Sequence, residues 1–269
     1  MPEESPTVAL LTDFGTRDPY VAAMKGVLLA GCGATLVDLG HDLPPFDPFA
    51  AGLFLRAIVS YYPRRPDPAS RMIFVAVIDP GVGTSRKILA AEEEGQVFVA
   101  PDNGLLSLVL GEEAAIHSAE NPAYFLPGGS STFHGRDRFA PVAAALANGI
   151  ELRELGPRVP RQSMVKLEYE VPCYEAEKAV GTVVSIDHFG NVITDLEVVR
   201  IPSLERAVAR VGLREVRDFS GTYGERSGSK EPFMIVGSSG SVEISLASAS
   251  AAEVLQIRRF DRVEIQYKG

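Results

Sequence analysis

The sequence of 269 residues contains only two cysteines, Cys32 and Cys173. Two cysteines are too few for a disulfide framework or for a zinc site built from cysteine thiolates. No apolar run approaches the roughly 20 residues that a membrane-spanning helix needs. The acidic start MPEESPTVALLTDFG also lacks the basic region and longer apolar core of a signal peptide. These absences predict a cytoplasmic protein without a membrane partner.

Basic residues are also in short supply. The chain has 26 Lys and Arg against 35 Asp and Glu, a formal net charge of −9. Non-specific binding to nucleic acid depends on neutralising phosphates, so this balance favours a small-molecule partner over a nucleic acid. Hydrophobic residues at 46% and charged residues at 23% are typical of a globular protein and give no sign of disorder.

The first 160 residues alternate apolar strands with helical segments. Strands are expected at 7–13, 34–40, 72–79 and 96–104, and helices at 18–31, 47–62 and 139–150. The strand at 72–79 is almost wholly apolar, as a strand covered on both faces should be. Alternating strands and helices predict an α/β domain over 1–160, with a mixed or mostly parallel sheet sandwiched by helices.

The pattern changes after Pro160. Short strands separated by turns, with little helix, follow in VKLEYEVPCYE, AVGTVVSID, NVITDL, RAVARVGL, PFMIVGSSGSVEISLA and DRVEIQYK. This pattern predicts an all-β, barrel-like domain over 161–269. The Pro-rich segment ELGPRVPRQS is the expected linker.

Polar residues stand where the four strands of the first domain end. Asp13, His41, Asp79 and Asp102-Asn103 follow these strands in turn. Ligands of open α/β sheets bind at the carboxyl ends of strands, so four such ends together suggest a site. Any single Asp there also has the simpler explanation of a helix N-cap.

Four loops add candidates, each with a plain structural alternative. DPGVGTSR lacks the spacing of known phosphate-binding loops, but it can fold back and pair Asp79 with Arg86. His134 in FHGRDRFAP suits proton transfer, whereas Arg136, Asp137 and Arg138 suit local ion pairs. IDHFGNVITD is either a hairpin loop or a site for an ammonium group. GSSGS is a turn whose hydroxyls and N–H groups could bind a carboxylate.

Five of these motifs occur in a fixed order: TDFGTRDPYVAAMKG, VIDPGVGTSR, APDNG, FHGRDRFAP and IDHFGN. The chain thereby resembles the S-adenosylmethionine hydroxide adenosyltransferases, the hydrolytic relatives of fluorinase and chlorinase, from about Val8 to Val263. The resemblance implies an N-terminal α/β domain, a C-terminal β-barrel and a homotrimer with the substrate held at subunit interfaces. It also implies that water cleaves S-adenosylmethionine to adenosine and methionine with no cofactor and no metal.

Carried over by position, the resemblance assigns roles to individual residues. Asp13 would bind the ribose hydroxyls, for which a carboxylate is an apt acceptor, and Phe46 would pack on the adenosine portion or serve as an ordinary core or interface aromatic. The methionine ammonium would contact Asp18, Asp187 and Asn191, and its carboxylate Ser238. The attacking water would be positioned by Asp79, Arg86 and His134.

Two positions bear on which branch of the family the chain resembles. The halogenating relatives carry Tyr at the position of Asp79 and lack the His of FHG, and Asp79 with His134 suits water rather than a halide.

The stretch SGSVEISLASASAAE is plainer than its counterparts in relatives. Adenine contacts there are therefore expected to come largely from the backbone.

Two other functions fit parts of the pattern. A metal-dependent phosphohydrolase would use Asp13, His41, Asp79, Asp102 and His134 as ligands, although the sequence lacks the expected DxH pair. A non-catalytic protein that binds S-adenosylmethionine or adenosine would not need both Asp79 and His134 near the reacting carbon. Which member of the group formed by Asp79, Arg86 and His134 accepts the proton stays open at this point.

Overall fold

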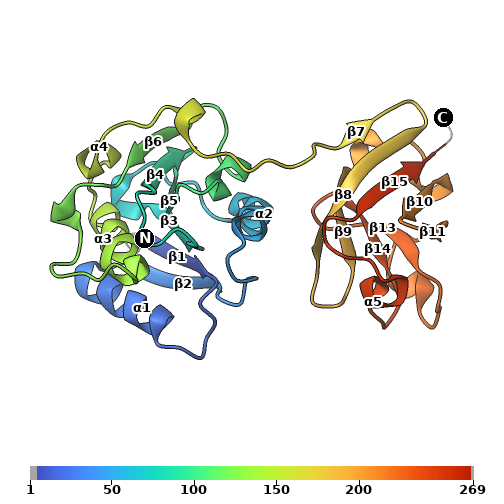
Figure 1. The fold of residues 1–269 in the computed structure, drawn as a ribbon, viewed down its shortest axis with the longest axis horizontal. Helices are drawn as coiled ribbons and strands as arrows, with labels where there is room; N and C mark the ends of the chain where they lie inside the picture. The colour runs from blue at the N-terminus through green and yellow to red at the C-terminus, as the bar shows by residue number, and fades with distance from the viewer. Residues whose placement is uncertain (1–4, 268–269) are drawn as a thin grey trace. The chain divides into compact units, whose positions relative to one another are not determined.

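The computed structural model of the chain describes residues 5–267. It contains two compact units, Met1–Leu167 (unit 1) and Glu168–Gly269 (unit 2) (Figure 1). Unit 1 is α/β and unit 2 is built almost entirely from strands. The fold class expected from the sequence is confirmed.

Unit 1 is built on a six-stranded mixed sheet with the strand order β2-β1-β3-β5-β4-β6. The first four strands in this order are parallel, and β4 runs antiparallel to both β5 and β6. The strands are β1 (Thr7–Thr12), β2 (Thr35–Gly40), β3 (Met72–Val77), β4 (Ile88–Glu93), β5 (Gln96–Pro101) and β6 (Ala115–Ser118).

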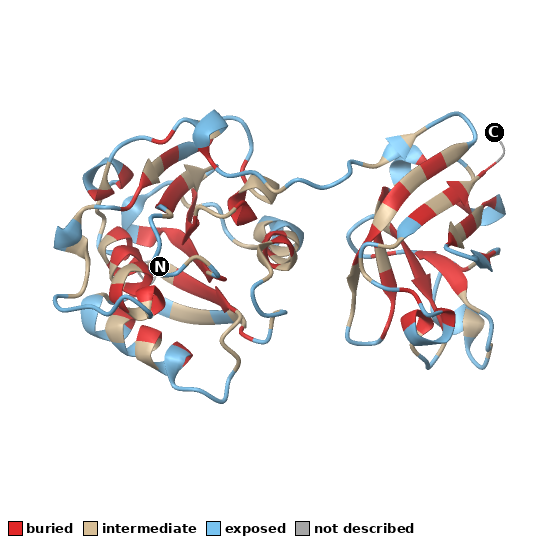
Figure 2. Ribbon diagram, in the orientation of Figure 1, coloured by how far each residue is buried: buried red, intermediate tan, exposed pale blue. Residues whose placement is uncertain are grey.

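Helices cover both faces of this sheet, as the apolar composition of β3 requires. Helices α1 (Tyr20–Gly31) and α3 (Ala140–Ala147) pack over the face that carries Ile73, Val75 and Val77. Helix α2 (Pro48–Ile58) packs over the opposite face with Met72, Phe74 and Ala76, and a short helix α4 (Leu152–Leu155) follows α3. All six residues of β3 are buried, and Figure 2 shows the central strands in the colour of buried residues.

Unit 2 is a nearly closed eight-stranded barrel with the order β11-β10-β15-β8-β9-β14-β13-β12, and β7 pairs with β8. Its alternating strands point one set of apolar side chains inward, among them Val183, Val192 and Ile244. A short helix, α5 (Ala251–Leu255), contributes to the same core. The strands are β7 (Cys173–Tyr174), β8 (Lys178–Ile186), β9 (Val192–Glu197), β10 (Val208–Val211), β11 (Arg214–Val216), β12 (Asp218–Phe219), β13 (Phe233–Val236), β14 (Ser241–Ser245) and β15 (Arg262–Gln266).

Some local expectations were wrong. The segment VKLEYEVPCYE forms a strand only at Cys173–Tyr174. At its start, the N–H groups of Val165 and Leu167 donate to Asp102 Oδ1 and Ser107 Oγ instead of to a neighbouring strand. The strand expected at 96–104 ends at Pro101. Strand β4, whose sequence ends in acidic residues, was not anticipated.

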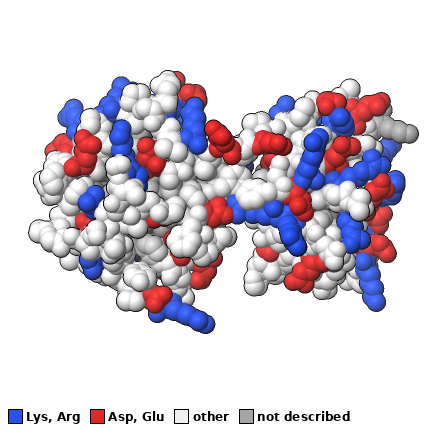
Figure 3. Space-filling model, in the orientation of Figure 1, with Lys and Arg blue, Asp and Glu red and all other residues white. Residues whose placement is uncertain are grey.

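The surface and the helices bear on possible partners. Within residues 5–267, no helix is both long enough and apolar enough to cross a bilayer. Figure 3 shows basic and acidic side chains interspersed over the visible face of unit 2. Ion pairs such as Arg210–Glu215 and Arg217–Glu215 belong to this mixed surface.

The packing of Phe74 gives a prediction about stability. Its ring stacks on Phe98 at a centroid distance of 5.2 Å and meets Tyr62 edge-on at 5.4 Å. Phe74→Ala is expected to lower the free energy of unfolding of unit 1 by about 3–5 kcal/mol, measured by urea denaturation. The control Leu29→Ala, at a side chain that is 68% exposed on α1, should change it by less than about 0.5 kcal/mol. Equal effects of the two substitutions would contradict this description of the core.

Candidate active site

The loop after β3 brings Asp79 and Arg86 together. Arg86 Nε donates to Asp79 Oδ1 at 2.8 Å, and Arg86 Nη2 donates to Asp79 Oδ2. Both side chains are largely buried, with 5% of Asp79 and 9% of Arg86 exposed. A two-point contact between guanidinium and carboxylate fixes direction as well as distance. The loop therefore holds Arg86 in a single orientation.

Glycine is required for this loop to fold back. Gly83 has a φ of +81°, and a Cβ at this position would lie 2.8 Å from the carbonyl oxygen of Ser131. Any other residue would be strained and would push away the segment that leads to His134. Asn103 supports the same loop from β5, because its side-chain amide donates to the carbonyl of Ile78 at 2.8 Å. Asn103, which follows β5, thus anchors Ile78, the residue that precedes Asp79.

His134 completes the cluster. Arg86 Nη2 lies 2.9 Å from His134 Nδ1, and a guanidinium can only donate, so Nδ1 is the acceptor. The neutral imidazole must then carry its proton on Nε2. The side chain is 2% exposed, and burial, followed by the charges of Arg138 and Arg86, lowers the pKa of His134. This environment keeps the ring neutral near pH 7.

Arg86 retains one unused donor in this cluster. Its Nη1 is buried and has no hydrogen-bond partner among the residues that the structure describes. The ring of Phe139 lies under the guanidinium, with its centroid 5.3 Å from Cζ. Because an unsatisfied buried donor is costly, Nη1 marks a place where a small polar molecule would be stabilised.

The turn after His134 explains the neighbouring charges. Residues Gly135–Phe139 form one turn of π-helix that runs into α3. Arg136 Nε donates to Asp137 Oδ1 at 2.6 Å, and Ser130 N donates to Asp137 Oδ2 at 2.7 Å. Arg138 lies over the ring of Phe125. The expectation of a local ion pair is confirmed for Arg136 and Asp137, and these contacts hold the backbone beside His134.

A second group of candidates lies at the end of β1. The carboxylate of Asp13 accepts a hydrogen bond from the backbone N–H of Phe46 at 2.8 Å. Phe46 is 74% exposed and has a φ of 62°, which is uncommon for a bulky residue. Asp18 is exposed before α1, and none of the hydrogen bonds among residues 5–267 links it to Asp13 or to His134.

In unit 2, Asp187 and Asn191 close one loop. Asp187 Oδ1 accepts from the N–H groups of Phe189 and Asn191, and Oδ2 accepts from Asn191 Nδ2 at 2.8 Å. These hydrogen bonds within the loop make it a turn between β8 and β9. A hairpin loop was one of the two interpretations of its sequence. Ser238 is exposed in a separate turn between Gly237 and Gly240, and no hydrogen bond among the described residues joins it to Asp187 or Asn191.

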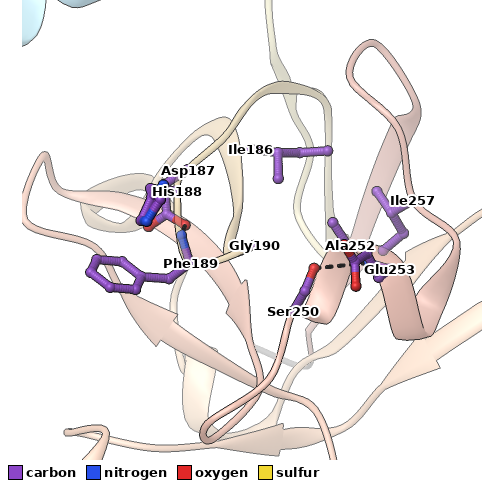
Figure 4. Close-up of a pocket in the computed structure, with 9 residues that line it drawn as sticks. All are labelled: Ile186, Asp187, His188, Phe189, Gly190, Ser250, Ala252, Glu253 and Ile257. Atoms are coloured by element: carbon purple, nitrogen blue, oxygen red, sulfur yellow. Dashed lines mark hydrogen bonds between the residues drawn. The ribbon is translucent and has the colours of Figure 1, made fainter.

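Sequence reasoning missed two residues next to these loops. Phe189 is 75% exposed and lines a cavity of about 340 Å³ with Asp187, Ser250 and Ile257 (Figure 4). Glu243 is buried in β14 against Gly237, where a Cβ would lie 1.9 Å from Glu243 Oε1. Burial and the charge of Asp187 raise the pKa of Glu243. The sequence signal for Glu243 was a glutamate placed between two apolar residues within the strand SVEIS.

The candidate metal ligands do not gather. Among residues 5–267 there is no group of three or more His, Cys, Asp or Glu side chains that could hold a metal ion. Asp102 has another role, since its Oδ1 accepts from the N–H of Val165 at 2.9 Å. His41 Nδ1 lies 2.9 Å from Thr12 Oγ1. No observation in the structure therefore favours the metal-dependent phosphohydrolase.

A buried Asp–Arg–His cluster with a spare donor, at the carboxyl end of a strand in an α/β unit, is the arrangement of an enzyme that orients a small polar reactant. Residues 8–156 match the SAM hydroxide adenosyltransferase N-terminal domain, and residues 181–264 match the C-terminal domain of the same family. The chain belongs to the S-adenosylmethionine hydroxide adenosyltransferase family.

Individual relatives agree with this assignment. The (R)-S-adenosyl-L-methionine hydrolase of Thermus thermophilus is 38% identical, over 93% of this chain and 96% of that protein. The hydrolase of Salinispora tropica is 34% identical, over 97% and 98%. A fluorinase of Nocardia brasiliensis is more distant, at 27% over 71% of each chain. An uncharacterized conserved protein from Thermotoga maritima has a similar structure, with a TM-score of 0.87, 33% identity and coverage of 97% and 100%.

The surroundings of His134 predict how it titrates. Because burial and nearby cations lower its pKa, the ring should take up a proton only below pH 6.5, the usual value for histidine. In an NMR titration, with the signal assigned through His134→Gln, the midpoint for His134 should lie below 6.5. The native state then binds fewer protons than the unfolded state below pH 6.5, so this group reduces stability as the pH falls. A midpoint at or above 6.5 would contradict the structure.

Proposed function

We propose that this chain hydrolyses S-adenosylmethionine to adenosine and L-methionine, with Asp79, Arg86 and His134 placing the attacking water. The observation that carries the proposal is the buried contact of Arg86 with both Asp79 and His134, in a chain that belongs to this family. The hydrolase names of its full-length relatives support it.

The reaction needs little covalent help from the protein. The oxygen of water forms a bond to C5′ of the ribose while the C5′–S bond breaks. The electron pair of the C5′–S bond stays on sulfur, and methionine leaves. One proton of the water is released. Because the sulfonium already makes a good leaving group, the main tasks are to align one water opposite the C5′–S bond and to stabilise its developing negative charge. Such alignment can contribute roughly 7–11 kcal/mol to lowering the barrier.

Arg86 suits the second task. The free Nη1 donor would hold the oxygen of the attacking water, and the guanidinium charge would favour its hydroxide form. Both carboxylate oxygens of Asp79 accept from the Arg86 guanidinium, and this pairing makes the carboxylate a weaker base. His134 accepts from Arg86 through Nδ1, so its Nε2–H can donate but not accept. We therefore assign the cluster to binding and polarising water, with the released proton passing to solvent.

The remaining candidates would bind the substrate. Asp13, held by Phe46 N, would accept from the ribose hydroxyls, and the exposed ring of Phe46 would cover the adenosine portion. Asp187, with Asn191 fixed beside it, would accept from the methionine ammonium together with Asp18. The turn with Ser238 would donate to the carboxylate.

Assembly and location follow the same proposal. Phe46 and Phe189 are both about three-quarters exposed in the single chain, and a ligand or a neighbouring subunit would cover them. We accordingly propose a cytoplasmic homotrimer with substrate sites at the subunit interfaces. The reaction as written balances without a metal or a cofactor.

The activity itself is the test. Purified protein is expected to convert S-adenosylmethionine to equal amounts of adenosine and methionine at the same rate with and without EDTA, followed by liquid chromatography. Asp79→Asn should lower kcat by about 10²-fold or more, since Arg86 loses its fixed orientation. The control Glu94→Gln removes an exposed partner of Arg64 and should change kcat less than twofold.

Two results would contradict hydrolysis by the Asp79 cluster. One is a folded protein that binds S-adenosylmethionine but forms no adenosine above the uncatalysed background, which is the behaviour of a non-catalytic binder. The other is full activity in Asp79→Asn, which would remove the cluster from the mechanism. Loss of activity with EDTA that returns with a divalent metal would also contradict a metal-independent reaction.

A further inference from the structure

A buried histidine outside the Asp79 cluster lies next to the end of β1. His41 is 7% exposed and follows β2. Its Nδ1 lies 2.9 Å from Thr12 Oγ1, and its Nε2 lies 3.1 Å from Asp38 Oδ1. Asp38 in turn accepts from Lys25 Nζ of α1 at 2.6 Å. Both ring nitrogens therefore have polar neighbours on different elements of unit 1.

These contacts begin where the β1–β2 ladder becomes irregular. The pairing of the two strands shifts between Leu10 and Leu11, and Leu11 is the last residue of β1 in this ladder, opposite Gly40. Beyond that point the Thr12–His41 contact joins the two segments. Thr12 Oγ1 also accepts from the N–H of Phe14 at 3.3 Å. When Nδ1 of His41 carries no proton, the Thr12 hydroxyl donates to it, and Oγ1 still has a lone pair for the N–H of Phe14.

The backbone of His41 holds the other side of the same turn. Its carbonyl accepts from the N–H of Gly15 at 2.7 Å, and Gly15 has a φ of +68°. The turn that contains Asp13 is thus bonded to His41 at its start, through Thr12, and at its end, through Gly15. Asp13 then accepts from Phe46 N, five residues after His41. The aspartate has little freedom to move relative to Phe46.

We propose that His41 is a positioning residue for ribose recognition, fixing the carboxylate of Asp13 through Thr12 and the turn at Gly15. The proposal rests on the proposed role of Asp13 in binding the ribose hydroxyls. A carboxylate that accepts from both hydroxyls must be held at one angle, because two hydrogen bonds to adjacent groups tolerate little rotation. The imidazole restrains Thr12 and the backbone carbonyl of His41 restrains Gly15, so His41 acts without touching the substrate.

The test is the preference for a ribose that has its hydroxyls. The affinities of the full chain for adenosine and for 2′,3′-dideoxyadenosine are measured by calorimetry, and their ratio is compared among variants. Asp13→Asn should bring the ratio close to one. His41→Phe and the near-isosteric Thr12→Val should lower it by about 3- to 10-fold. In the hydrolysis assay, both variants should raise KM by a larger factor than they lower kcat.

A matched control comes from a second histidine of unit 1. His117 on β6 is half-buried, and its Nδ1 lies 2.9 Å from the carbonyl oxygen of Gly156. His117→Phe should leave the adenosine to dideoxyadenosine ratio unchanged. Circular dichroism melts identify variants that fail to fold, and Thr12→Val carries the test if His41→Phe is one of them.

Each of the other outcomes overturns the proposal. If Asp13→Asn lowers the ratio but His41→Phe and Thr12→Val lower both affinities equally, His41 is merely structural and the role of Asp13 stands. If Asp13→Asn leaves the ratio unchanged, the ribose assignment fails and the positioning role fails with it. If kcat falls more than KM rises, His41 acts on the reaction step and not on recognition.

Discussion

The contact between Arg86 and Asp79 organises the candidate active site. A guanidinium buried to this degree is stabilised only if an opposite charge pairs with it in good geometry, and Asp79 does so with both oxygens. The pair leaves Arg86 Nη2 in reach of His134 and Nη1 without a partner among the described residues. One ion pair therefore orients the cation and, through Nη2, sets the tautomer of the neutral histidine, while one donor of Arg86 stays unused within residues 5–267.

The fold places this contact at a site that the rest of unit 1 supports. Strand β3 is covered by helices on both faces, so the loop that follows it starts from a rigid point. Asn103 on the adjacent strand end bonds to the carbonyl of Ile78, and the π-helical turn holds His134 from the other side. Asp102 and Asn103 are structural in this sense, because their side chains bond to the backbone of Val165 and Ile78.

The sequence allowed the two architectures to be predicted, because the change from alternating strands and helices to short strands near Pro160 is visible without coordinates. The fold-back of the Gly-rich loop was also predictable from its turn residues. The contact between His134 and Arg86 could not be predicted from the sequence pattern, because 48 residues separate the two. Only the family resemblance connected them. Contacts such as His41 with Thr12 and Glu243 with Gly237 depend on packing and register, which the sequence pattern does not specify.

The central claim is that water attacks C5′ of S-adenosylmethionine in a site built on Arg86. Hydrolysis in water enriched in oxygen-18, followed by mass spectrometry of both products, tests it most directly. One labelled oxygen is expected in the 5′-hydroxyl of adenosine and none in methionine, with labelling lost together with activity in Arg86→Met. Unlabelled adenosine, or products such as adenine or 5′-methylthioadenosine that require a different bond to break, would contradict it.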